Sequence, residues 1–384
     1  MRPERLFFAV FLSVFSFGLS TVRGGGPDLP PLDAGRIATE EARGIKFSSN
    51  KLVLLKYDEK LPDAEYTIPA GVKRIGKEAF RGCLNLKKVT IPAGVTVIGE
   101  NAFYECKNLE SVTIPAGVTV IGGRAFYKCE NLTGVIIPPG VTVIGENAFH
   151  ACENLESMTI PPGVAIIGEG AFSYCKKLTV VTIPSSVMEI GVGAFDNCGK
   201  IEVSPENPRY FNDSCGALID REEQKLMHLP SSFSGVYRTP PGVTVIGDYA
   251  GHFCLGLTGL VISPGVTTIG KNVFSICRNL KKVEIPSSVK IIGEMAFAMC
   301  RNLTDLTIGN GVEFIGVMAF SHCVRLPSVK IPPSVMSIGN EAFRYCYDLE
   351  DVKIEGKSVH IGDAAFEDCP CEEKIKKRFP SYGK

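Results

Sequence analysis

The chain has 384 residues, and its 41 lysines and arginines balance its 41 aspartates and glutamates. A chain without net charge has no long-range field to attract a polyanion, so we expect neither nucleic acid nor an anionic membrane surface as a partner. Its length would allow two or three domains, but a single repeated pattern fills most of it.

The N-terminal residues have the composition of an export signal. Two arginines lie within Met1 to Arg5, and an apolar run extends from Leu6 to Leu19. This order predicts a secretory signal peptide over residues 1–20, with an N-terminal core segment or a membrane anchor as the alternatives. No second long apolar stretch follows, so we expect no stable membrane insertion of the mature chain and a secreted or cell-surface location.

Residues 21–43 contain a glycine triplet and three prolines, which predicts a flexible spacer. In residues 44–67, two short apolar runs flank a polar turn, and the same order returns within residues 199–238. Both segments precede a block of repeats, so we expect each to contain a β-hairpin that starts or restarts the repeat array. A protruding loop that contacts a partner is the alternative for the insertion.

A 23-residue unit fills residues 68–198 and 239–371, with six copies in each block. The pattern is I-P-x-G/S-V-x-x-I-G-x-x-A-F-x-x-C-x-x-L-x-x-V-x, and one clear copy runs from Ile91 to Thr113. The L-x-x-V-x-I run, ended by proline, predicts a short strand, V-x-x-I a second extended piece, and A-F-x-x-C a brief helical turn. One unit buries only one side, so the units must stack as the coils of an α/β solenoid with short parallel strands.

This pattern resembles the BspA-like leucine-rich repeat family from about Ile68 to Cys369. The resemblance implies a right-handed leucine-rich-repeat solenoid and a surface or adhesion protein. The chain departs from the widespread leucine-rich pattern, because glycine or serine stands where the buried Asn or Cys would fall, as at Gly94, Gly117 and Ser186.

Twelve of the fourteen cysteines occupy one slot of the repeat. They are Cys83, Cys106, Cys129, Cys152, Cys175, Cys198, Cys254, Cys277, Cys300, Cys323, Cys346 and Cys369. Equivalent side chains of stacked coils point the same way, whereas a disulfide needs converging Cβ atoms, so we predict buried thiols. The slot has no C-x-x-C spacing or histidine partner, so we expect no metal site. Cys215 and Cys371 lie outside the slot, and either a disulfide or a free thiol remains open for them.

No catalytic motif is present: the sequence has neither G-x-S-x-G nor H-E-x-x-H, and we expect no enzyme activity and no cofactor. The alternative is an active site in the insertion, where Asp213, Cys215, Asp220 and His228 are the reactive residues. A third possibility is self-assembly through the solenoid ends. The tail, residues 372–384, has the composition of a cap.

The exposed positions of the L-x-x-V-x-I strands are the candidate binding site for a protein or glycan ligand. The candidate residues are Lys88, Thr90, Ser111, Thr113, Ser157, Thr159, Thr182, Lys282, Glu284, Asp305, Thr307 and Lys330. The alternative for any single member is that threonine merely favours strands on a half-exposed sheet.

Overall fold

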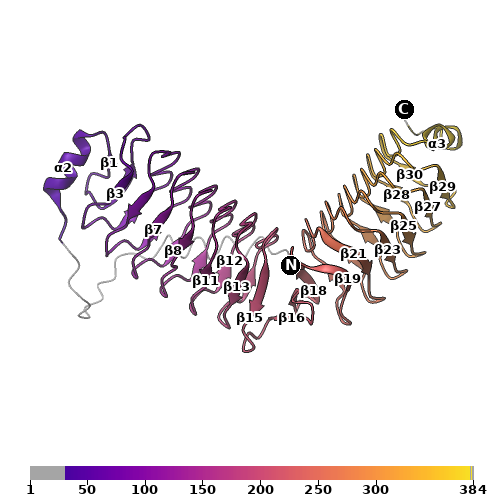
Figure 1. Cartoon of the computed structure of the whole chain (residues 1–384), viewed down its shortest axis with the longest axis horizontal. Helices are drawn as coiled ribbons and strands as arrows, with labels where there is room; N and C mark the ends of the chain where they lie inside the picture. The colour runs from indigo at the N-terminus through magenta and orange to yellow at the C-terminus, as the bar shows by residue number, and fades with distance from the viewer. Residues whose placement is uncertain (1–30, 381, 383–384) are drawn as a thin grey trace.

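The computed structural model describes residues 31–380 and Tyr382, so the predicted signal peptide over residues 1–20 lies outside the described residues. The chain forms a solenoid whose first block descends toward the insertion and whose second block rises away from it (Figure 1). The described segments contain no helix with the length and apolar character needed to cross a membrane. The predicted solenoid of parallel strands is confirmed.

Each coil has three sides, and the first is built by the L-x-x-V-x-I run. We call this side the strand face. Its strands are β3 (Glu65–Thr67), β5 (Lys88–Thr90), β7 (Ser111–Thr113), β9 (Gly134–Val135), β11 (Met158–Thr159), β13 (Val180–Ile183), β15 (Lys200–Val203), β19 (Ser234–Arg238), β21 (Gly256–Val261), β23 (Lys282–Ile285), β25 (Asp305–Ile308), β27 (Ser328–Ile331) and β29 (Asp351–Ile354). Neighbours pair in parallel, but the ladder is divided into four separate sheets.

The V-x-x-I run builds the second side, which we call the side sheet. Its strands are β2 (Val53–Lys56), β4 (Arg74–Ile75), β6 (Val97–Ile98), β8 (Val120–Ile121), β10 (Val143–Ile144), β12 (Ile166–Ile167), β14 (Glu189–Ile190), β18 (Lys225–His228), β20 (Val245–Ile246), β22 (Thr268–Ile269), β24 (Ile291–Ile292), β26 (Phe314–Ile315), β28 (Ser337–Ile338) and β30 (His360–Ile361). Every neighbouring pair is parallel except where the insertion separates β14 from β18.

The third side, the corner, replaces the helical turn that the sequence predicts. Asn101 and Glu105 have φ angles of 54° and 56°, in the left-handed region, and the same two slots are left-handed in the other coils. Their N–H groups donate to the next coil, to Gly123 at 2.9 Å and Tyr127 at 2.8 Å. The prediction of a helical turn was wrong, because these amides bond between coils and not along the chain.

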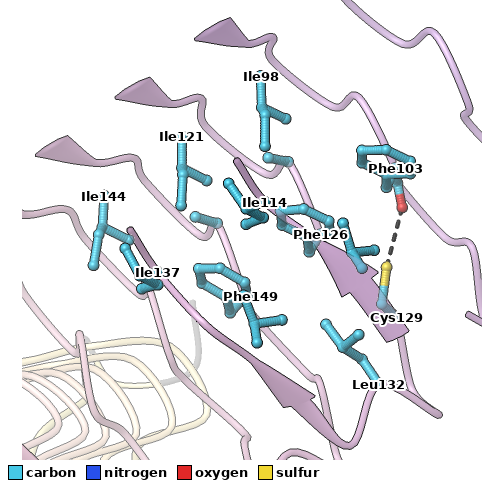
Figure 2. Close-up of a cluster of buried hydrophobic side chains, with 14 of the residues drawn as sticks. Ile98, Phe103, Ile114, Ile121, Phe126, Cys129, Leu132, Ile137, Ile144 and Phe149 are labelled. Carbon is cyan, nitrogen blue, oxygen red and sulfur yellow. Dashed lines mark hydrogen bonds between the residues drawn. The ribbon is translucent and has the colours of Figure 1, made fainter. Parts of the chain in front are cut away.

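The interior consists of parallel columns of identical side chains (Figure 2). Phe103 and Phe126 stack with centroids 5.1 Å apart, and every ring in this column is fully buried up to Phe172. The glycine after the side-sheet isoleucine allows the close approach of coils, since a Cβ on Gly99 would lie 2.8 Å from the backbone carbon of Gly76. The repeat therefore specifies both the columns and the spacing between coils.

The cysteine column is buried and free of disulfides, as predicted; all fourteen cysteines lie in the described part of the chain and carry free thiols. Each thiol of the repeat slot from Cys106 to Cys369 also donates a hydrogen bond that the sequence did not suggest. Cys129 Sγ lies 3.2 Å from the carbonyl oxygen of Phe103 in the preceding coil (Figure 2), and Cys175 Sγ lies 3.1 Å from that of Phe149. The column therefore fixes the corner as well as filling space.

The insertion is a wedge between the two blocks. It places β16 (Tyr210–Asn212) and β17 (Leu218–Asp220) ahead of β18, so three strands separate β14 from β20 on the side sheet. The strand face gains only β15 and β19, which do not pair with each other. Successive residues of β17 pack into different cores, because Leu218 belongs to the core of the first block and Ile219 to that of the second.

Helices cover both ends of the array. At the N-terminal end, α2 (Ala34–Ala42) buries Ile37, with Asp33 as its N-cap. The expectation of a flexible spacer was therefore wrong for residues 34–42, because the helix has an apolar residue to bury and a side-chain cap. A hairpin of β1 (Lys46–Phe47) and β2 follows and pairs with the first coil. At the other end, α3 (Glu372–Arg378) buries Ile375 against the last coil.

Candidate functional site

All twelve candidate residues lie on the strand face. Eleven are exposed and Thr90 is half-buried. Register brings neighbours together: Lys88 lies opposite Ser111, Thr159 opposite Thr182, and Lys282 opposite Asp305. The division of the ladder into four sheets means that the twelve do not form one regular row.

The hydroxyl groups differ in engagement with their position in the coil. Directly before a strand, Thr119 and Thr133 each donate to a carbonyl oxygen of the preceding coil at 3.3 Å. Within the strands of the strand face, the outward candidate hydroxyls make no hydrogen bond to any described residue; they belong to Ser111, Thr113, Ser157 and Thr159. These hydroxyls are therefore available to an external partner.

Charge is arranged differently in the two blocks. In the second block, Lys282 contacts Glu284 at 2.7 Å and Asp305 at 3.4 Å, and these two carboxylates raise the pKa of its ammonium. Lys330 likewise pairs with Glu355 at 3.2 Å. In the first block, the outward positions from β7 to β13 carry no charge at all.

Three residues in this uncharged stretch, Gly134, Ile136 and Val180, were not among the candidates, and the first two interrupt the rows of serine and threonine. Gly134 stands where its neighbours have serine, and Ile136, which is 85% exposed, stands where they have threonine. The interruption of the serine and threonine rows was a visible signal for both. Isoleucine favours strands as threonine does, so strand propensity does not distinguish the two residues; Ile136 differs by placing an apolar side chain in solvent next to Gly134.

Three of the four reactive residues of the insertion are held by structural partners, whereas Cys215 is exposed. Asp213 accepts from the Tyr237 hydroxyl at 2.9 Å, and Asp220 accepts from Arg209 at 2.8 Å. His228 is buried and lies 3.2 Å from the Gly199 carbonyl, and burial lowers the pKa of its imidazole. Their side chains are not hydrogen-bonded to one another within the described residues, so the geometry offers no nucleophile and base pair.

A buried acid and imidazole join the two blocks at the corner. His252 Nδ1 lies 2.9 Å from one Asp196 oxygen and 3.1 Å from the other, and both side chains are less than a tenth exposed. They meet because the insertion contributes a shortened turn here, in which Leu229 bonds directly to Ala250. Among the described residues, no other contact between an acidic and a basic side chain links the first block directly to the second.

No group of three or more histidine, cysteine or acidic residues in the described segments is arranged to hold a metal ion. Neither the insertion nor the junction pair therefore offers a built metal centre.

Comparison with known proteins identifies the repeat. A family model described as the BspA type leucine rich repeat region, with six copies, matches residues 73–202 and 244–372. A search among curated proteins found no match.

Several solved structures share the fold. A leucine rich cell surface protein from Faecalibacterium prausnitzii is 28% identical, with a TM-score of 0.69 over 82% of this chain and 93% of that one. A leucine-rich repeat protein from Eubacterium ventriosum is 23% identical, with a TM-score of 0.60 over 81% of this chain and 91% of that one. The pneumococcal vaccine antigen PcpA is 19% identical, with a TM-score of 0.56 over 80% of each chain.

The last two likenesses concern the fold alone, whereas the family model spans more than half of the chain in two segments that match the two blocks of coils. The chain therefore belongs to the BspA type leucine-rich repeat family.

Proposed function

We propose that this chain is a secreted or cell-surface recognition protein, without catalytic activity, that binds a macromolecular partner through its strand face. The observation that carries the proposal is a row of unengaged hydroxyls on an uncharged stretch of the strand face. The outward hydroxyls of Ser111, Thr113, Ser157 and Thr159 make no hydrogen bond within the described residues, and the outward positions from β7 to β13 carry no charge. A sheet that leaves donors and acceptors unused along a rigid scaffold is suited to recognition.

Membership of a family with a cell-surface relative supports the location. The Faecalibacterium protein at 28% identity is described as a cell surface protein. The signal-like N-terminus points the same way. Neither observation identifies the partner, so the proposal is limited to binding by this face.

The alternatives have less support. An active site in the insertion would need Asp213 or Asp220 to be free, and both carboxylates bond structural partners. Self-assembly through the ends would need open coils, but α2 and α3 bury Ile37 and Ile375 over them. The ends of the array are therefore capped in the manner of a monomeric solenoid.

The test compares two sets of surface substitutions against immobilised fibronectin, collagen and a glycan array. The strand-face variant carries Ser111→Lys, Thr113→Lys and Thr182→Lys, and the control carries Thr142→Lys and Met188→Lys on the exposed side sheet. We expect the strand-face variant to lose at least about 10-fold in affinity for any probe that the parent binds, because desolvated lysines oppose docking. Equal loss in the control, or no loss in the strand-face variant, contradicts the proposal.

A further inference from the structure

The strand face of the first block is interrupted at β9. Between β9 and β11 the ladder is reduced to one isolated bridge, between Gly134 and Ser157. Val135 and Met158 beneath the interruption are 5% and 6% exposed, and Val112 in the intact ladder beside them is also 6% exposed, so the core stays buried. The interruption therefore leaves a gap between two strands of the first block above a closed core.

This gap is a groove with apolar walls. Residues 134–137 and 157–159 line it together with Pro139, Pro161 and Pro162, and its volume is about 410 Å³. A Cβ added to Gly134 would meet no atom within 4 Å, so the groove is open directly above this residue. Beside it, Ile136 is 85% exposed. Aliphatic atoms thus form a recess above Gly134 and an adjoining ridge at Ile136. We call the recess and the ridge together the notch.

The charged residues that directly precede the strands beside the notch lie next to residues of opposite charge. Glu110, before β7, contacts Lys87 at 3.4 Å, and Glu156, before Ser157, lies 4.0 Å from Lys177. The outward positions from β7 to β13 are uncharged. A charged partner segment would lose its hydration on this surface without gaining an opposite charge, so the site favours a neutral segment.

The exposed groups also distinguish a polypeptide from a sugar. No aromatic ring stands on the strand face between β5 and β13, so the flat platform on which sugars stack is missing from this part of the described surface. The unpartnered hydroxyls of Ser157 and Thr159 lie at the groove and can bond peptide groups. The apolar recess accepts one aliphatic or aromatic side chain, which is how central anchors act in protein interfaces.

We propose that the notch is where the strand face recognises its partner, and that the partner is a protein that inserts an apolar side chain from an uncharged segment. This inference rests on the proposed binding by the strand face and names the chemistry of that partner. Its distinctive consequence is an affinity that depends little on salt, because no ion pair forms.

The experiment selects random displayed peptides on the full chain and then measures the free synthetic peptides by calorimetry. Selected peptides should share a leucine, phenylalanine or tyrosine within an uncharged stretch. Their affinity should change less than about 2-fold between about 0.05 M and about 0.5 M NaCl. Peptides that carry charge and weaken steeply with salt would overturn the proposal, as would selection of no peptide.

Two pairs of variants locate the site. Gly134→Trp fills the recess and Ile136→Asp charges the ridge; each should weaken the peptides at least about 10-fold. Gly134→Ser restores the residue of the neighbouring coils, and Val180→Asp places the same charge on an exposed residue of β13, so both should bind as the parent does. The fold is expected to survive all four, because Gly134 has open space above it and Ile136 and Val180 are exposed.

The outcomes separate this inference from the proposed function. If the two notch variants bind the peptides as the parent does while the lysine variant of Ser111, Thr113 and Thr182 does not, the notch is wrong and the strand face stands. If no strand-face substitution alters binding, both are wrong. Dimerisation of the parent that Ile136→Asp abolishes would assign the notch to a second copy and would also overturn the proposal.

Discussion

The junction pair, Asp196 with His252, should contribute more to stability than any surface ion pair in the molecule. Replacing either residue with alanine leaves the other buried without its hydrogen-bond partner. Their side chains are 5% and 7% exposed, and the loss expected from breaking such a buried pair is about 3–5 kcal/mol. Both strand ladders are interrupted at the insertion, so the continuous ladder that joins ordinary coils cannot compensate.

The assay is urea unfolding followed by far-UV circular dichroism for the parent, the two alanine variants and the double variant Asp196→Leu with His252→Phe. The apolar double variant removes both polar groups at once, so it should recover most of the lost free energy of unfolding. We expect a coupling energy above about 1 kcal/mol between the two positions. Small-angle X-ray scattering should show a wider range of angles between the blocks in the alanine variants.

The matched control is Lys107→Ala, which breaks an exposed pair with Glu130 at 3.1 Å. Solvent screens that pair, so its loss should lower the free energy of unfolding by less than about 1 kcal/mol. If the Asp196 and His252 variants resemble this control, or if their effects simply add, the pair does not join the blocks energetically.

Three further predictions concern the coil itself. In the native protein only Cys215 should react rapidly with a thiol reagent, and all fourteen cysteines should react after denaturation, because Cys215 is the one exposed thiol. Burial raises the pKa of the column thiols, to about 12 for Cys277. The contribution of these neutral thiols to stability should therefore be complete below about pH 8 and be lost as the pH rises from about 9 toward 12. Urea titrations at each pH would measure this loss in the free energy of unfolding. Ala151→Gly should raise the free energy of unfolding by about 1 kcal/mol, because Ala151 has a φ of 55°. Ala148→Gly in the same coil should lower it by a similar amount, because Ala148 is fully buried and is not among the residues with positive φ. Equal signs for the two alanine changes would contradict the account of the corner.

Much of the fold could be predicted because the same apolar positions recur in all twelve repeats. The columns of Ile98, Phe103 and Cys106 follow directly from spacing. The corner was harder, because A-F-x-x-C fits a helical turn as well as two tight turns. Left-handed residues such as Glu105 and Ile276 are not favoured by their side chains, and only the bonds to the next coil hold them there.

The candidate site shows where local patterns stop being informative. The strand face and its exposed residues could be read from alternation along each strand. The geometry of the insertion could not be predicted in this way. The contact between Asp196 and His252 depends on how many residues the insertion places on each side of the stack. The same is true of the notch, since the gap above Gly134 arises from a lost ladder between coils and not from the glycine alone.

The wedge also bears on how such a chain can change in length. Each ordinary coil contacts only the coils before and after it, so a gene that gains or loses one whole unit preserves every column. The insertion divides this freedom in two, because β17 presents Leu218 to one core and Ile219 to the other. Each block can then gain or lose units while the insertion between the two blocks keeps its geometry. The angle between the blocks is set by the insertion, whereas the length of each block is set by its number of units.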